Sequence, residues 1–149
     1  MAENIQNDIV IDTNVMGLYD SPKDENIKRL FRWLRSDGIL TMSKRLLTEY
    51  GRSGNQKIFV LINELQRKGR YNLISNSEID SFTEDKHFNY KSNYKDRAHA
   101  RLVFLSIRKK LIALDSPLVD DVNSFKKING IKPCACKATS CCYFQENSE

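Results

Sequence analysis

The chain has 149 residues, of which 40% are hydrophobic and 29% charged, a composition typical of one soluble globular domain. Charged residues interrupt its apolar stretches before they reach the roughly 18 residues of a membrane span, and the N-terminus lacks the features of a signal peptide, so we predict a cytoplasmic protein. The formal net charge of +5 excludes a strongly acidic chain and suits a polyanionic partner.

The first third of the chain predicts two strands that alternate with two helices. An apolar run at residues 8–12 predicts the first strand. Asp24 is expected to open a helix, because apolar side chains follow it at helical spacing until Asp37-Gly38. Residues 39–42 predict a second strand, and Ser43 is a suitable N-cap for the helix that follows.

The middle of the chain predicts a long helix at residues 56–68, with Gly69 at its end, and a third strand at residues 71–74. Residues 76–94 are polar and aromatic, with a short helix expected near residues 78–82. We predict a mobile loop here, and such loops often control access to a site.

Asp96 is expected to begin a strong helix, and residues 111–114 predict a fourth strand that Asp115 follows. Pro117 suits the first turn of a further helix. Strands that alternate with helices indicate a parallel sheet covered on both faces. Because we find no internal repeat, we predict one domain over residues 1–128.

All four cysteines lie in a predicted C-terminal tail, residues 129–149. They are Cys134, Cys136, Cys141 and Cys142. A zinc site of four thiolates is one interpretation, but the spacing lacks the usual pair of C-x-x-C motifs. We favour an unstructured or oxidation-sensitive tail, and in a cytoplasmic protein we expect reduced thiols.

Two predicted strands end in an acid, Asp12 after the first and Asp115 after the fourth. In a parallel sheet both side chains would emerge at the carboxyl edge, where open α/β sheets bind ligands. Glu49 lies on the helix after the second strand, and Asp96 begins the helix before the fourth. If the fold brings these carboxylates together, they predict a site for a divalent cation.

The order and distances of four stretches resemble the motifs of the PIN-domain ribonucleases, a family that includes many bacterial toxins of toxin–antitoxin pairs. The stretches are Ile9-Val10-Ile11-Asp12-Thr13-Asn14, Leu47-Thr48-Glu49-Tyr50, Asp96-Arg97-Ala98-His99-Ala100 and Leu111-Ile112-Ala113-Leu114-Asp115. The resemblance extends to about Phe125. It implies a three-layer α/β/α fold with a central parallel sheet of four to five strands.

The resemblance also implies a catalytic site that holds one or two Mg²⁺ or Mn²⁺ ions. Its catalytic and metal-binding residues would be Asp12, Glu49, Asp96 and Asp115, with Thr13 and Asn14 in support. Carboxylates are the hard oxygen ligands that Mg²⁺ prefers. A metal-activated water would also make a nucleophilic side chain unnecessary.

One position departs from the family, because Ala113 stands where members often have a threonine two residues before the last acid. Asp120 and Asp121 therefore stay as alternative or additional ligands. His99 lies one helical turn beyond Asp96, and we interpret it as a partly buried packing residue that could also touch substrate.

The function implied by the resemblance is a metal-dependent endoribonuclease that hydrolyses phosphodiester bonds of single-stranded RNA. The expected partners are this RNA, an antitoxin protein and a second copy of the chain in a homodimer. Two alternatives stay open: a structure-specific DNA nuclease of related fold, and a non-catalytic domain that binds RNA or a protein. A receiver-like regulatory domain is disfavoured, because the first predicted strand ends in a single Asp and the third ends without one.

Overall fold

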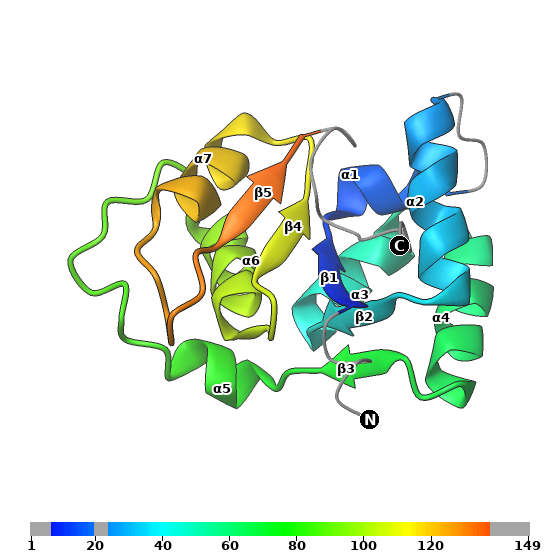
Figure 1. Cartoon of the computed structure of the whole chain (residues 1–149), viewed down its shortest axis with the longest axis horizontal. Coiled ribbons are helices and arrows are strands. Elements are labelled where there is room, and N and C mark those ends of the chain that lie inside the picture. Colours follow the sequence, from blue (N-terminus) through cyan, green and yellow to red (C-terminus); the bar gives the residue numbers. More distant parts are fainter. Residues whose placement is uncertain (1–6, 20–23, 138–149) are drawn as a thin grey trace.

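The computed structural model describes residues 7–19 and 24–137, which contain five strands and seven helices (Figure 1). The strands are β1 (Asp8–Ile11), β2 (Ile39–Met42), β3 (Tyr71–Leu73), β4 (Lys110–Ile112) and β5 (Cys134–Cys136). The helices are α1 (Thr13–Met16), α2 (Glu25–Ser36), α3 (Lys44–Arg52), α4 (Lys57–Arg67), α5 (Asn76–Asp80), α6 (Tyr94–Leu105) and α7 (Ser116–Ser124). None of these helices combines the length and apolarity needed to cross a membrane.

The five strands form one parallel sheet in the order β3-β2-β1-β4-β5. In β1, Ile9 pairs with Leu40 of β2, and Ile11 pairs with Ile112 of β4. The strand order changes direction at β1, because β2 and β3 add on one side and β4 and β5 on the other. Right-handed crossovers therefore place α2, α3 and α4 on one face and α5, α6 and α7 on the other. The predicted three-layer α/β/α fold is confirmed.

The central strand β1 is buried along its whole length. Its three apolar residues belong to the core, as expected for a strand covered on both faces. Asp8, at its amino end, is also buried, and its carboxylate accepts hydrogen bonds from the backbone N–H groups of Ile107 at 2.7 Å and Arg108 at 2.9 Å. This acid is satisfied within the fold, at the opposite end of β1 from Asp12.

Helix caps follow the sequence prediction at α3 and differ from it at α6. Ser43 accepts a hydrogen bond from the backbone N–H of Leu46, as an N-cap should. α6 begins at Tyr94, two residues earlier than predicted, because Asn93 is the N-cap and accepts from the backbone N–H of Asp96 at 3.0 Å. The Asp96 carboxylate therefore does not cap the helix.

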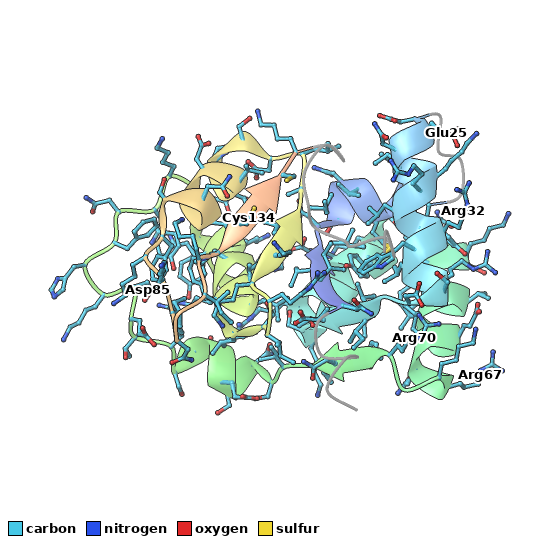
Figure 2. The ribbon with its side chains drawn as sticks, in the orientation of Figure 1. Glu25, Arg32, Arg67, Arg70, Asp85 and Cys134 are labelled. Atoms are coloured by element: carbon cyan, nitrogen blue, oxygen red, sulfur yellow. The ribbon has the colours of Figure 1, made fainter. Side chains whose placement is uncertain are left out.

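β5 lies in the segment predicted to be an unstructured tail, and it completes the sheet (Figures 1 and 2). Cys134 pairs with Lys110 of β4. α7 holds the strand through Asn123, whose side chain donates to the carbonyl of Ala135 at 3.0 Å and accepts from its N–H at 2.7 Å. The sheet thus continues beyond residue 128, where the sequence placed the domain end.

The cysteines do not all stand as free thiols. Cys134 is a free cysteine and Cys136 is disulfide-bonded, whereas Cys141 and Cys142 lie outside the described residues. A disulfide sulfur offers no thiolate to zinc. Within residues 7–19 and 24–137, the predicted four-cysteine site therefore has one free thiol, and the expectation of reduced thiols does not hold at Cys136.

The polar stretch at residues 76–94, predicted as a mobile loop, is anchored to the core. Asp85 is buried and accepts a hydrogen bond from Arg101 on α6 at 2.8 Å. Phe88 packs edge-on against Phe125, with 5.0 Å between the ring centroids. These contacts join the segment to α6 and to the end of α7.

Candidate active site

Asp12 lies at the carboxyl end of β1, where the strand order changes direction. Its backbone N–H donates to the carbonyl of Ile112 in β4 at 2.9 Å, which fixes it beside the neighbouring strand. Asp12 occupies the N-cap position of α1, but its carboxylate makes no capping hydrogen bond. Open α/β sheets bind their ligands at such a switch point, so the Asp12 side chain lies at the edge where a ligand would be expected.

Glu49 approaches Asp12 from α3. The next residue, Tyr50, is fully buried and donates from its hydroxyl to the carbonyl of Ile11, which fixes α3 against the end of β1. Both carboxylate oxygens of Glu49 have partners. Oε1 accepts from the hydroxyl of Thr13 at 2.9 Å, and Oε2 lies 2.8 Å from Nε2 of His99.

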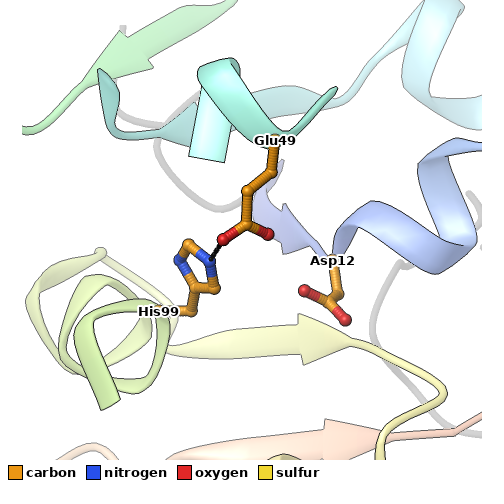
Figure 3. A group of neighbouring side chains, drawn as sticks. All are labelled: Asp12, Glu49 and His99. Carbon is orange, nitrogen blue, oxygen red and sulfur yellow. Dashed lines mark hydrogen bonds and ion pairs between the residues drawn. The ribbon is translucent and has the colours of Figure 1, made fainter. Parts of the chain in front are cut away.

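His99 enters the same cluster from α6, with only 2% of its surface exposed. One ligand atom from each of Asp12, Glu49 and His99 lies within 4.8 Å of the others, and Figure 3 shows the three side chains converging from separate elements. The sequence predicts His99 to be a partly buried packing residue that could touch substrate, and it does not predict this contact with Glu49. The position of His99 three residues after Asp96 could have indicated that both side chains reach the same site, because residues at this spacing share a helix face.

Asp96 and Asp115 complete the acidic edge. Asp96 lies in the first turn of α6, and Asp115 occupies the N-cap position of α7. The Asp115 carboxyl group is near enough to Asp96 to raise its pKa, and both groups interact electrostatically with Asp12. The structure therefore brings all four predicted acids to one end of the sheet, together with His99.

The crowding of acids changes their protonation. Burial raises the pKa of Asp12, and the charges of Glu49 and Asp115 add to this effect. Burial and the neighbouring Asp115 carboxyl group raise the pKa of Asp96 to about 6. The hydrogen bond from His99 lowers the pKa of Glu49. Burial alone would lower the pKa of His99, but the hydrogen bond with Glu49 and the charges of the neighbouring acids outweigh burial and raise it.

The other predicted site residues, Asn14, Asp120 and Asp121, are exposed or make contacts outside this cluster. Asn14 is exposed. Asp120 is exposed and pairs with Lys91 at 3.7 Å. Asp121 is buried and accepts from the backbone N–H groups of Lys91 at 2.7 Å and Ser92 at 2.9 Å. Both oxygens of Asp121 thus hold the segment before α6.

A groove of about 390 Å³ opens beside Glu49 and His99, between α3, α5 and α6. Its cationic lining residues are Arg45, Arg52, Lys95, Arg97 and Arg101. Two of them are paired with acids, Arg45 with Asp80 at 3.1 Å and Arg101 with Asp85 at 2.8 Å. Tyr94 also lines the groove and is 83% exposed. The groove is therefore basic, with an aromatic ring at its surface.

Comparison with solved structures confirms the fold. The chain is similar to one chain of the crystal structure of VapBC2 from Rickettsia felis bound to a DNA fragment from their promoter. The identity is 15% and the TM-score 0.50, over 87% of this chain and 99% of that chain. No protein-family model and no curated protein sequence matches. At this identity the likeness shows the fold alone, and the predicted PIN-like fold is confirmed.

Proposed function

We propose that this chain is a metal-dependent endoribonuclease that hydrolyses phosphodiester bonds of single-stranded RNA. One observation carries the proposal: Asp12, Glu49 and His99 converge at the switch point of the sheet, with Asp96 and Asp115 beside them. A buried acidic cluster at the ligand-binding edge of an α/β sheet fits metal-assisted hydrolysis better than it fits a structural role.

The donor atoms fit a divalent cation such as Mg²⁺ or Mn²⁺. Asp12 and Glu49 offer hard carboxylate oxygens within the 4.8 Å cluster, and Asp96 and Asp115 offer more. Burial first, and then the neighbouring carboxyl groups, raise the pKa values of Asp12 and Asp96, and a bound cation would favour the charged form of both acids. When bound, such a cation lowers the pKa of a coordinated water and stabilises the oxygen that leaves the phosphate.

The protein's own residues orient these groups and control their protons. Thr13 and His99 fix the two oxygens of Glu49 in one orientation. Because the pKa of Asp96 is about 6, this carboxyl group beside Asp115 can hold a proton in mildly acidic solution. Burial of Asp12 and His99 limits competing contacts with bulk water.

The basic groove supports RNA as the polyanionic substrate. Arg52, Lys95 and Arg97 are exposed cations that line it, and phosphate contacts of this kind supply most of the sequence-independent affinity for nucleic acid. Tyr94 offers a ring on which an unpaired base could stack. A groove that begins at Glu49 and His99 would lead a single strand directly past the acids.

An antitoxin protein is the partner that we propose, because the similar solved structure is a toxin–antitoxin complex. A homodimer is proposed with it, because members of the PIN-domain family that the sequence resembles are commonly dimers. Co-purification with the product of a neighbouring gene, followed by measurement of mass in solution, tests both. Inhibition of RNA cleavage by that partner is the expected result, and cleavage unaffected by it would count against the assignment.

A cleavage assay with labelled single-stranded RNA tests the activity. Wild-type protein with Mg²⁺ or Mn²⁺ should cleave, chelation should abolish cleavage, and Asp12→Asn should reduce it at least about 100-fold. Glu25→Gln is the matched control, because Glu25 is an exposed acid on α2 that pairs only with Lys28, at 3.9 Å, in the described residues (Figure 2).

Parallel assays on branched DNA separate the proposal from the structure-specific DNA nuclease. Preferential cutting of the branched DNA would identify DNA, and not RNA, as the substrate. RNA retention without cleavage, by both the wild type and Asp12→Asn, would instead identify a non-catalytic RNA-binding domain.

A further inference from the structure

We propose that His99 binds the metal ion through Nε2, an inference that rests on the proposed metal site. A nitrogen ligand would make the site prefer a divalent transition-metal ion such as Mn²⁺ over Mg²⁺. The family resemblance supplied only acids as ligands. The inference comes from the position of His99 in this chain, where an imidazole nitrogen enters a cluster otherwise made of carboxylate oxygens.

The separations between donor atoms suit a shared ion. Ligands held about 2.1 Å from one octahedral ion lie about 3 Å apart when adjacent and about 4.2 Å apart when opposite. Nε2 of His99 and Oε2 of Glu49 are 2.8 Å apart, and the full set of Asp12, Glu49 and His99 atoms fits within 4.8 Å. Small side-chain shifts would bring all three donors onto one cation, which would replace the proton now shared by His99 and Glu49.

The hydrogen bond with Glu49 fixes the orientation of the His99 imidazole. Nε2 faces Glu49, whereas Nδ1 is buried without a hydrogen-bond partner among the described residues. The ring therefore presents Nε2, the nitrogen that would bind the ion, to the carboxylates of the cluster. Glu49 is itself oriented by Thr13, so this carboxylate has outer support of the kind that metal ligands usually have.

The spacing along α6 supports a mixed oxygen and nitrogen set. Asp96 and His99 are three residues apart and both reach the acidic edge. Carboxylate-x-x-His pairs on one helix face build iron and manganese centres in helical proteins. Mg²⁺ instead keeps waters and takes oxygen ligands, so a nitrogen donor favours the transition metal.

Pulsed electron paramagnetic resonance of Mn²⁺ bound to the tag-free full chain tests the inference directly, with no RNA present. Coordinated imidazole gives ¹⁴N modulations that change when the protein is grown with ¹⁵N-histidine. The chain has two histidines, His87 and His99. His87 is exposed in the segment between α5 and α6, so His87→Gln is the matched control. We expect the ¹⁴N signal in the wild type and in His87→Gln, and its loss in His99→Gln.

Competition titrations give the second readout. The ratio of Mn²⁺ to Mg²⁺ affinity should fall about tenfold or more in His99→Gln and stay unchanged in His87→Gln. If His99→Gln does not fold, the isotope change in His87→Gln still decides, because His99 is then the only histidine left. Bound Mn²⁺ without a histidine nitrogen signal would overturn this inference alone. Absence of any Mn²⁺ or Mg²⁺ binding would overturn the proposed metal-dependent function as well.

Discussion

The hydroxyl of Thr13 donates a hydrogen bond of 2.9 Å to Oε1 of Glu49, across 36 residues of sequence. This contact joins the start of α1 to the middle of α3. Because Oε2 of the same carboxylate lies 2.8 Å from His99, Glu49 is held from two sides. A carboxylate fixed in this way loses little freedom when it binds a cation, so Thr13 should act on the site through Glu49.

Replacement of Thr13 by valine should reduce RNA cleavage about 10- to 100-fold, because the side-chain shape is kept while the hydroxyl that orients Glu49 is lost. The loss should also appear as weaker Mn²⁺ binding in a titration without RNA. Thr13→Ser keeps the hydroxyl and is the control, with activity expected within about threefold of wild type. Equal activity of the valine and wild-type proteins would remove Thr13 from the site.

The basic groove predicts a specific salt dependence. Removal of two exposed groove cations, in the double variant Arg52→Gln/Lys95→Gln, should weaken RNA binding and reduce the slope of log affinity against log salt by about 1 to 2. The charge-matched control is Arg67→Gln/Lys127→Gln, since neither residue lines the groove. Filter binding or anisotropy at several salt concentrations measures the slopes. The same slope in both double variants would place the RNA elsewhere.

The fold predicted from the sequence was accurate where the pattern is local. β1 is a continuous apolar run that is buried along its length, and Ser43 is both a predicted and an observed cap. The acids at strand ends follow from the same pattern, since a parallel sheet collects Asp12 and Asp115 at one edge. The candidate acids could therefore be selected from the sequence alone, by their positions at strand ends and on helices.

What the sequence missed depends on contacts between distant residues. The role of His99 comes from Glu49, 50 residues earlier, and no local pattern reports that contact. β5 has only three residues and is fixed by Asn123 on α7. The loop predicted to be mobile is anchored by two such distant contacts. Asp85 of the loop binds Arg101 on α6, and Asp121 on α7 binds the loop backbone at Lys91. Length and composition describe such segments poorly, because their stability comes from tertiary contacts.

The ion pair between Asp85 and Arg101 predicts a dependence of stability on pH. Burial alone would raise the pKa of Asp85, but hydrogen bonds from Arg101 and Tyr90 outweigh it and lower that pKa below the ordinary value. In the unfolded chain Asp85 has an ordinary pKa of about 3.9. Between this pKa and the lower pKa of the folded protein, the unfolded state therefore binds more protons than the folded state. The contribution of Asp85 to the free energy of unfolding is then complete above about pH 5 and is lost as the pH falls below about 4.

Urea unfolding of Asp85→Asn measures this contribution. We expect a loss of about 1 to 3 kcal/mol at pH 7, because a buried charged acceptor is removed, and a difference from wild type that shrinks between about pH 5 and pH 3. Glu84→Gln is the neighbouring control: its exposed pair with Lys126, at 3.9 Å, should contribute less than about 0.5 kcal/mol at any pH. A difference that stays constant with pH would contradict the assigned shift.

The contact between Asn123 and Ala135 predicts that β5 supports the site from a distance. The Asn123 side chain makes both backbone hydrogen bonds to Ala135, and α7, which carries it, begins beside Asp115. Asn123→Ala removes the side-chain partners of the partly buried N–H and carbonyl of Ala135 and should lower the free energy of unfolding by about 1 to 2 kcal/mol. Asn89→Ala, in the exposed part of the loop before α6, is the control and should change it by less than about 0.5 kcal/mol. If α7 also shifts, RNA cleavage should fall in Asn123→Ala at temperatures where the protein is still folded. A variant as stable as wild type would show that β5 pairs with β4 without help from α7.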